Sequence, residues 1–328
     1  MIGHLVRGAA LVAGQEFRIR LRTGRWRWLL GAWVLVLAVF TALVDAALSS
    51  VHMSGARGVP LLGILMLFVL GLVLVISPAL TAQSVNGDRE RGTLATLQIT
   101  RLTPVQIALG KLAAGWAVGL VALALTLPFV GWAMAEGGLT IARVAGVVSV
   151  AALLMGVVCA FSQALSALLA RSITSALLSY VVVFALTAGT GIAFGVLSPL
   201  VAEHRPTVGS YDETISRPDR IWWLLAPNPF VILADSAPQL PPRVVEGPDG
   251  RTYVRPDDPL SAFGQEVRRI RIPPDTASGS SAGLIGDEWA VWPYGLGFDL
   301  LLAAGAVWVT ARRLRAPSHR IPRGVRVG

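Results

Sequence analysis

Charged side chains are scarce in this chain of 328 residues: only 14% are Asp, Glu, Lys or Arg, whereas 54% of the residues are hydrophobic. A soluble domain carries about a quarter charged residues, so the composition excludes an ordinary soluble protein and predicts an integral membrane protein. The net charge of +9 would suggest a nucleic-acid partner for a soluble chain. Here the basic residues gather at the ends of apolar runs, so membrane orientation explains them and we expect no nucleic-acid partner.

Cysteine and lysine each occur once, as Cys159 and Lys111. A single cysteine excludes a disulfide within the chain. The four histidines lack the spacing of a metal site, no serine lies in a nucleophile elbow, and the G-x-x-x-x-G-K-[ST] phosphate loop is absent. Gly110-Lys111 is followed by Leu112 and lacks the upstream glycine. We therefore expect no enzyme, no metal site, and no cofactor bound by this chain, including ATP.

Apolar runs of bilayer length predict an all-α integral membrane fold with six transmembrane helices. The predicted spans are 28–48, 61–82, 105–135, 141–170, 173–201 and 292–311. Residues 28–201 thus hold the first five spans, with a bend expected at Pro128 and a tight turn at Glu136-Gly137-Gly138. Arginine placement assigns both termini, the segment 84–104 and the basic tail 312–328 to the cytoplasmic side of the cell membrane. The excess of arginine over lysine, 27 to 1, suggests a bacterial source.

The two regions outside the spans differ in character. Residues 1–27 mix apolar side chains with six arginines and predict a cytoplasmic amphipathic helix on the membrane surface; a plain topogenic basic tail is the alternative. Residues 202–291 hold 12 of the 20 prolines and 13 of the 19 acidic residues, which predicts a polar extracytoplasmic insert between helices 5 and 6.

Three elements are predicted within the insert. Residues 243–245 and 251–254 flank a turn and predict a β-hairpin. Residues 221–233 are apolar but broken by prolines, which fits an interfacial or re-entrant element. Residues 276–283 have the composition of a flexible linker.

The longest polar interruption in the first 201 residues runs from Ser84 to Lys111. It begins with the charged run NGDRERGT, and a short helix is predicted from Thr93 to Arg101. Thr103-Pro104-Val105-Gln106 predicts a capped restart of the third span. The position of this segment between two spans suits it to contact with a soluble partner.

Three stretches resemble the permease subunits of the type-two ABC exporter family: Glu16-Phe17-Arg18, Asn86-Gly87-Asp88-Arg89-Glu90-Arg91-Gly92-Thr93-Leu94 and Leu109-Gly110-Lys111. The resemblance implies a connecting helix at residues 4–24 and a coupling helix that docks on a separate ABC ATPase subunit, which binds ATP and Mg²⁺. It also implies a second copy of the permease or a related one. The residues expected to couple to the ATPase are Asp88, Arg89, Glu90, Arg91, Gly92, Thr93, Leu94, Leu97 and Arg101.

For several residues within the spans, the sequence allows two interpretations of their role. Two pairs of glycines permit close helix packing, either within one subunit or at a dimer interface. They are Gly115 with Gly119, and Gly191 with Gly195. Asp299 in the sixth span is a candidate functional carboxylate or a structural group facing the insert.

Other polar side chains in or near the spans are equally ambiguous. Asp45 and Arg143 lie at outer span ends, where we expect them to snorkel or to form pairs rather than to act as a functional site. The polar side chains of the fifth span line a path or bond to their own backbone; they are Ser172, Thr174, Ser175, Ser179, Tyr180, Thr187 and Thr190.

The resemblance therefore implies the transmembrane permease subunit of an ATP-driven ABC exporter, and the mainly apolar spans suggest an amphipathic or lipid-like substrate. Its expected partners are the ATPase, a second permease and membrane lipid. Two alternatives stay open. One is a membrane-anchored scaffold or sensor whose insert binds an extracytoplasmic partner; the other is an ion-coupled transporter that uses Asp299.

Overall fold

The computed structural model describes residues 2–22, 24–50, 56–90, 92, 102–206, 212–238, 243–246, 252–255, 258–273 and 285–315. Six stretches of helix are long and apolar enough to cross a membrane, and they cover residues 28–50, 58–90, 104–135, 141–168, 172–201 and 287–313. The prediction of a helical membrane protein with six spans is confirmed. The predicted linker at 276–283 lies outside the described residues.

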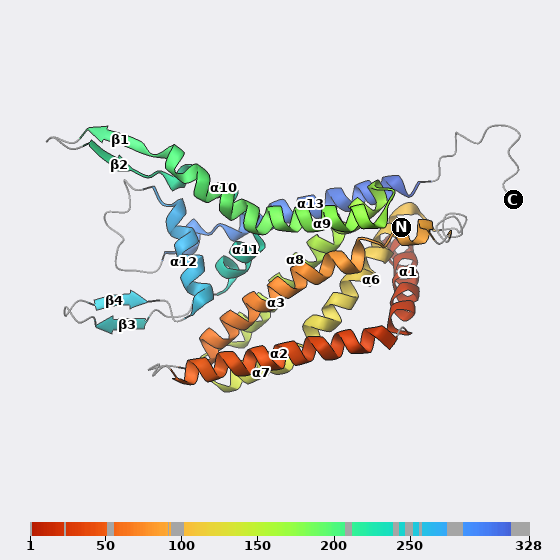
Figure 1. The fold of residues 1–328 in the computed structure, drawn as a ribbon, viewed down its shortest axis with the longest axis horizontal. Helices are drawn as coiled ribbons and strands as arrows, with labels where there is room; N and C mark the ends of the chain where they lie inside the picture. The colour runs from red at the N-terminus through yellow and green to blue at the C-terminus, as the bar shows by residue number, and fades with distance from the viewer. Residues whose placement is uncertain are drawn as a thin grey trace, which may run out of the picture.

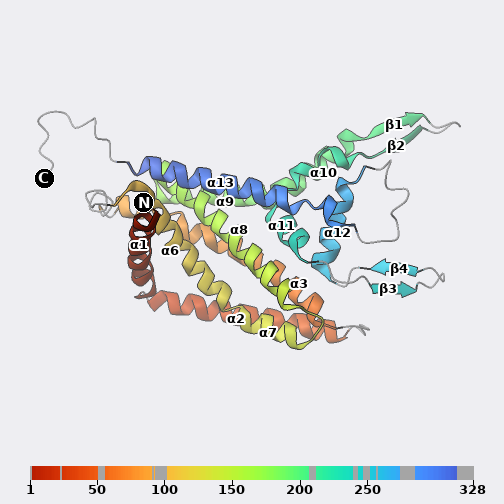
Figure 2. The ribbon, with the colours of Figure 1, turned by 180° about the vertical axis from the view of Figure 1, so that it is seen from behind.

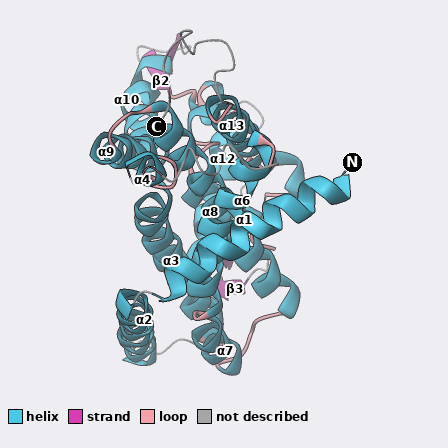
Figure 3. Ribbon diagram, turned by 90° about the vertical axis from the view of Figure 1, so that its right-hand side faces the viewer, coloured by secondary structure: helices cyan, strands magenta, loops and turns pink. Residues whose placement is uncertain are grey.

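The bundle contains long helices that run roughly side by side (Figure 1). In chain order its helices are α1 (Ile2–Arg22), α2 (Gly24–Ser50), α3 (Gly58–Thr81), α4 (Asn86–Glu90), α6 (Pro104–Ala124), α7 (Leu127–Ala135), α8 (Ile141–Leu168), α9 (Ser172–Phe184), the π-helix η1 (Ala185–Gly189), α10 (Thr190–Leu197), the 3-10 turn η2 (Ser198–Val201) and α13 (Trp292–Arg313). We call the end with α1 and α4 the α1 end, and the opposite end, which carries the insert, the insert end. Seen from the α1 end, α1 lies across the bundle (Figure 3).

Proline and capping residues set the boundaries of several helices. Thr103 precedes Pro104 and forms the predicted capping box with Gln106, each side chain bonded to the other's backbone N–H. The predicted bend of the third span is a break between α6 and α7. Because proline clashes with the carbonyl four residues earlier, Pro128 ends α6 at Ala124.

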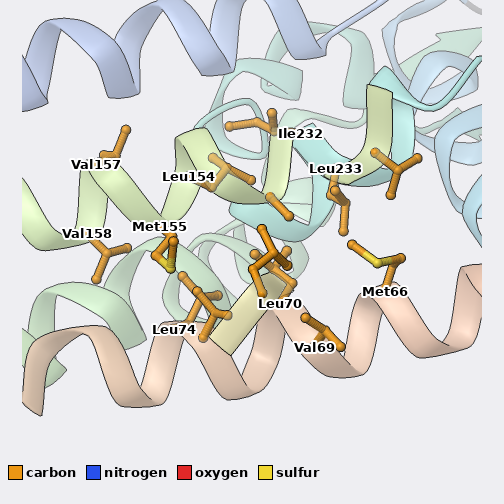
Figure 4. Packing of buried hydrophobic residues seen from close by; sticks show 14 of the residues in the cluster. Met66, Val69, Leu70, Leu74, Leu154, Met155, Val157, Val158, Ile232 and Leu233 are labelled. Atoms are coloured by element: carbon orange, nitrogen blue, oxygen red, sulfur yellow. The ribbon is translucent and has the colours of Figure 1, made fainter. Parts of the chain in front are cut away.

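The core of the bundle forms where α3 faces α8, which also packs against α13 (Figures 1 and 2). Leu70 and Leu74 of α3 lie opposite Leu154 and Met155 of α8 in one buried cluster (Figure 4). Lipid tails are as apolar as these side chains, so close van der Waals packing stabilises such a contact. By contrast α2 is largely exposed, with Phe40 stacked on Phe68 of α3 at 3.8 Å between ring centroids.

The insert combines hairpins, short turns and two helices. Its elements are β1 (Glu203–Pro206), β2 (Asp212–Ile215), η3 (Pro218–Arg220), η4 (Trp222–Leu224), α11 (Pro229–Ser236), β3 (Arg243–Glu246), β4 (Thr252–Arg255), α12 (Pro259–Arg271) and η6 (Asp287–Trp289). The predicted hairpin is confirmed: β3 and β4 pair antiparallel, with Val244 opposite Val254. A second hairpin, β1–β2, was not predicted.

Helix α11 covers part of the stretch predicted to be interfacial or re-entrant. It is enclosed by α3, α8, α12 and α13, and Ile232 and Leu233 are fully buried in the same cluster as the α3 and α8 side chains (Figure 4). Helix α11 is therefore packed among the other helices, while the choice between an interfacial and a re-entrant element stays a prediction. Only the start of the stretch reaches the surface, where Trp223 is 57% exposed.

Asp235 of α11 joins the insert helices to the start of α13. Its Oδ2 accepts hydrogen bonds from the backbone N–H groups of Val291 and Trp292, at 2.6 and 2.8 Å. A carboxylate at this position also complements the positive N-terminal end of the α13 dipole. Its Oδ1 accepts from Nε of Arg268 at 2.5 Å, and Arg268 also contacts Asp287 at 2.8 Å. Burial lowers the pKa of Arg268, but the two carboxylates outweigh burial and raise it, so the guanidinium stays charged.

A second buried ion pair fastens α12 to the start of α8. Nη2 of Arg143 lies 2.6 Å from Asp258, and both side chains are 1% exposed. The same guanidinium donates to Ser261 at 3.2 Å and to the carbonyl of Pro238. The sequence offered snorkelling or pairing for Arg143, and the structure shows pairing. For Asp45, one carboxylate oxygen is buried with no hydrogen-bond partner among the described residues.

Gly295 allows α13 to approach the chain before α11. A Cβ at this position would overlap the carbonyl oxygen of Ala226 and lie 2.9 Å from Cγ1 of Ile232. We expect Gly295→Ala to lower the free energy of unfolding by about 1–3 kcal/mol, the usual cost of overpacking. Thermal unfolding of the detergent-solubilised chain measures the change.

Gly297→Ala is the matched control, because nothing lies within 4 Å of its Cβ position. Alanine is favoured over glycine in a helix by about 0.5–1 kcal/mol, so this variant should be neutral or slightly more stable. Equal losses in the two variants would contradict the close approach at Gly295.

Candidate coupling site

The polar segment after α3 is fastened to α8 and α9 by side chains of those helices. The backbone N–H groups of Val85 and Asn86 both donate to the Ser166 hydroxyl of α8, at 3.1 Å. The hydroxyl of Ser175 in α9 donates to the carbonyl of Ala82 at 2.9 Å. Since exposed backbone groups are costly at a span end, these hydroxyls allow the chain to leave α3 and start α4 while its polar groups stay bonded.

The charged residues of α4 continue this attachment. The Arg89 guanidinium donates to the Asn86 side chain at 2.9 Å and to the carbonyl of Leu169 at 3.1 Å, in the turn after α8. Glu90 accepts a hydrogen bond from the Ser172 hydroxyl at 2.6 Å, at the start of α9. Arg89 and Glu90 are exposed, so two of the predicted coupling residues present charge at the α1 end.

Lys111 joins α1, α4 and α6. Its ammonium group contacts both Glu16 of α1 and Asp88 of α4. The Lys111 side chain is 1% exposed, that of Asp88 10% and that of Glu16 23%. A buried charge is tolerated when it is paired, and a lysine with two carboxylates leaves the trio with a net charge of −1. Asp88 therefore connects the polar segment to α6 and α1, whereas Arg89 and Glu90 connect it to the region between α8 and α9.

Helix α1 lies close against α6 because two glycines remove side chains from the contact. A Cβ on Gly110 would lie 2.5 Å from Cβ of Val12, and one on Gly8 would clash with the Gln106 side chain. The same Gln106 donates to the carbonyl of His4 at 2.9 Å. The described part of the predicted connecting helix is thus a helix packed directly on the third span.

The remaining predicted coupling residues divide into two groups. Gly92 is described: its φ of +71° is the left-handed conformation that glycine adopts most easily, and it follows the end of α4. The others lie outside the described residues, and they are Arg91, Thr93, Leu94, Leu97 and Arg101. The predicted short helix at 93–101 therefore stays a prediction.

The two glycine pairs have different surroundings. A Cβ on Gly115 would meet Cγ2 of Thr81 at 2.5 Å, and one on Gly119 would clash with Met155, so this pair serves packing within the chain. Gly191 and Gly195 have nothing within 4 Å. Only the second pair is open to a partner outside the chain.

The polar side chains of the fifth span bond mainly to backbone. Hydroxyls of Ser179, Thr187 and Thr190 donate to carbonyls one turn earlier, and that of Tyr180 donates to the carbonyl of Val75 at 3.0 Å. The π-helix η1 lies in this span, and Asn228 of the insert donates to Thr187 O and to Thr190 Oγ1, both at 2.8 Å. The structure thus shows bonding to the helix's own backbone for Ser179, Thr187 and Thr190, whereas Ser172, Ser175 and Tyr180 bond to other elements.

Asp299 lies two turns into α13, in the half nearer the insert, away from the coupling segment. It is 1% exposed, and its Oδ1 has no hydrogen-bond partner among the described residues. Within the same part of the chain, no group of three or more His, Cys, Asp or Glu side chains is placed to hold a metal ion. Asp299 thus remains a candidate functional carboxylate, with no such metal-binding group around it among the described residues.

Sequence reasoning did not identify the partners in the ion pairs that organise both ends, although it offered pairing for Arg143. Lys111 was noted only as part of a motif, although a single lysine within a predicted span is itself a signal of a paired group. Its partners lie 95 and 23 residues away, and no local pattern indicates them. Asp235 and Arg268 gave no signal, since they lie in a polar insert where charges are common.

Replacing Lys111 by methionine removes the cation and leaves Glu16 and Asp88 without it. Breaking a buried pair on one side costs about 3–5 kcal/mol, and we expect Lys111→Met to lower the free energy of unfolding by that order. Chemical denaturation in detergent measures the loss, and faster proteolysis within residues 2–22 reports the release of α1.

A double-mutant cycle tests whether the loss belongs to the pair. Lys111→Met and Glu16→Gln should couple by about 1–3 kcal/mol. Glu90→Gln is the control, because this exposed carboxylate bonds to Ser172, and its effect should add to that of Lys111→Met within about 0.5 kcal/mol. Additive effects for Glu16 and Lys111 would disprove the ion pair.

Comparison with known proteins agrees with this arrangement of spans and polar segments. No curated protein matches the chain. The profile of the family described as "ABC-2 family transporter protein" matches residues 10–240, from α1 to just beyond α11, which is more than half of the chain. The protein is therefore a membrane transport component, and its chain belongs to the ABC-2 family of transporter proteins.

Proposed function

We propose that this chain is the permease subunit of an ATP-driven ABC exporter, with segment 84–104 as its dock for the ATPase. The observation that carries the proposal is the Lys111 ion-pair cluster with Glu16 and Asp88. It joins the start of the coupling segment to α1 and to the third span. Force applied to the segment would therefore reach the spans directly.

The mechanism uses the attachments of α4. ATP-driven closure of two ATPase subunits would push segment 84–104, and α4 would transmit the movement to α3, to α6 through Lys111, and to α8 and α9 through Ser166 and Ser175. Tilting of these helices then exchanges inward-open and outward-open states. ATP and Mg²⁺ would bind only to the ATPase, since this sequence contains no phosphate loop.

The proposal also includes the orientation of the chain in the membrane and its pairing with a second permease. The excess of arginine at the α1 end favours a cytoplasmic position for that end and for both termini, which leaves the insert extracytoplasmic in a bacterial cell membrane. A second copy or a related permease would pair along α9 and α10, where Gly191 and Gly195 are open. The exposed apolar side chains of these helices suit an amphipathic or lipid-like substrate.

Leu97→Asp tests the dock. Placing a charge on an apolar position of the predicted coupling helix should abolish association with the ATPase. The measurement is affinity purification of the full chain from its native membranes in mild detergent, with mass spectrometry of copurified proteins. The unsubstituted chain should bring down an ABC ATPase in stoichiometric amount.

Phe263→Asp is the control, because Phe263 is 39% exposed on α12 at the insert end, and it should retain the ATPase. Purification of the unsubstituted chain without an ATPase, or equal loss in both variants, would contradict the proposal.

Buried Asp299 favours an ion-coupled transporter as a second candidate function. An unpartnered carboxylate within a span is a usual site of ion coupling. Asp299→Asn should abolish transport in reconstituted vesicles under this function, with or without ATP. Under the ABC mechanism, transport should persist in this variant and should require the ATPase and ATP.

A further inference from the structure

The arginines near the insert end differ in their partners. Six of those with described side chains have a carboxylate within 4 Å: Arg57, Arg143, Arg217, Arg220, Arg268 and Arg269. Arg271, the last residue of α12, has none in the part of the chain that the structure describes. Its guanidinium donates instead to two neutral oxygens, Ala290 O at 2.7 Å and Tyr294 Oη at 3.3 Å.

Aromatic rings from three elements surround the Arg271 guanidinium. Its central carbon lies 4.9 Å from the ring centroids of Trp222 in η4 and Tyr294 in α13, and 5.9 Å from that of Trp289 in η6. These cation–π contacts fix the guanidinium at the surface without neutralising its charge. Arg271 is itself partly exposed and the neighbouring Tyr294 is 55% exposed, so the guanidinium is partly open to an anion.

Tyr294 also begins a continuous exposed stripe along α13. The stripe continues at helical spacing through Phe298, Leu301, Trp308 and Arg312, and its apolar members are 51–75% exposed. At its far end, the Arg312 guanidinium lies 5.2 Å from the Trp308 ring. Each end of the stripe thus carries an aromatic ring with an arginine.

The length of the stripe matches a bilayer. From Tyr294 to Arg312 the helix rises roughly 27 Å at 1.5 Å per residue, close to the hydrocarbon thickness of about 30 Å. Tryptophan and tyrosine favour the membrane–water interface. This match places Arg271 at the depth of lipid headgroups, beside tails that lie along α13.

We propose that the Arg271 cluster, with Trp222, Trp289 and Tyr294, binds the phosphate of a phospholipid headgroup in the leaflet at the insert end. A quaternary ammonium group is disfavoured because the guanidinium already occupies the space between the rings. A soluble anion would gain the charge contact but not the apolar stripe. The bound lipid would hold α12 and η6 against the membrane surface, a role that goes beyond the proposed function and does not depend on it.

Photocrosslinking tests the site on the full chain in detergent. The probe is phosphatidylglycerol with a photoactivatable group, and mass spectrometry quantifies adducts on peptides that contain Trp222, Trp289 or Tyr294. We expect Arg271→Gln to reduce these adducts three- to tenfold and Arg271→Lys to restore most of the yield. A diacylglycerol probe with the same tails but no phosphate should label weakly and equally in all variants.

Arg269→Gln is the matched control, because Arg269 lies on the same helix, is exposed, and pairs with Glu266 at 3.4 Å. Its adduct yield should match that of the unsubstituted chain. Unchanged labelling in Arg271→Gln at an unchanged melting temperature would overturn the proposal, as would equal loss in Arg269→Gln. Displacement of the lipid by an equal concentration of inorganic phosphate would assign the site to a soluble anion and would also overturn it.

Discussion

The α1 end of this protein depends on one buried cation. Lys111 lies in a span where an unpaired ammonium would cost several kcal/mol, and Glu16 and Asp88 compensate that cost only when α1 and α4 both lie against α6. The ion pairs therefore specify one arrangement of three segments that apolar contacts alone would leave free to slide. Only in that arrangement can Gly8 of α1 and Gly110 of α6 bring the two helices into close contact.

Buried ion pairs also fix the arrangement of segments at the insert end. Two buried ion pairs join elements that are distant in the sequence: Arg143 with Asp258, and Arg268 with Asp235. Between the two ends the helices meet mainly through apolar side chains and small residues, with a few hydrogen bonds such as that from Trp116 Nε1 to the carbonyl of Ala152 at 2.9 Å. Polar groups thus fix the ends of the bundle, and close van der Waals packing holds its middle together.

The sequence allowed the spans, the capping box at Thr103 and the β3–β4 hairpin to be predicted, because each depends on residues close together in the chain. Ion-pair partners could not be assigned, since Lys111 and Glu16 are separated by 95 positions. The two glycine pairs show the same limit: identical spacing leads to internal packing at Gly115 and to an open surface at Gly191. Spacing predicts that a helix can be approached closely, but not which element approaches it.

The energy of the Lys111 cluster also constrains any movement of the bundle. Separating α1 or α4 from Lys111 would cost about 3–5 kcal/mol, more than the roughly 1–3 kcal/mol of a typical coupling free energy between two sites. We therefore infer that α1, α4 and the first turns of α6 move as one body. Movement would then be absorbed where helical bonding is already interrupted, at the α6–α7 break and at the π-helix η1, since irregular turns change conformation at lower cost than continuous helix.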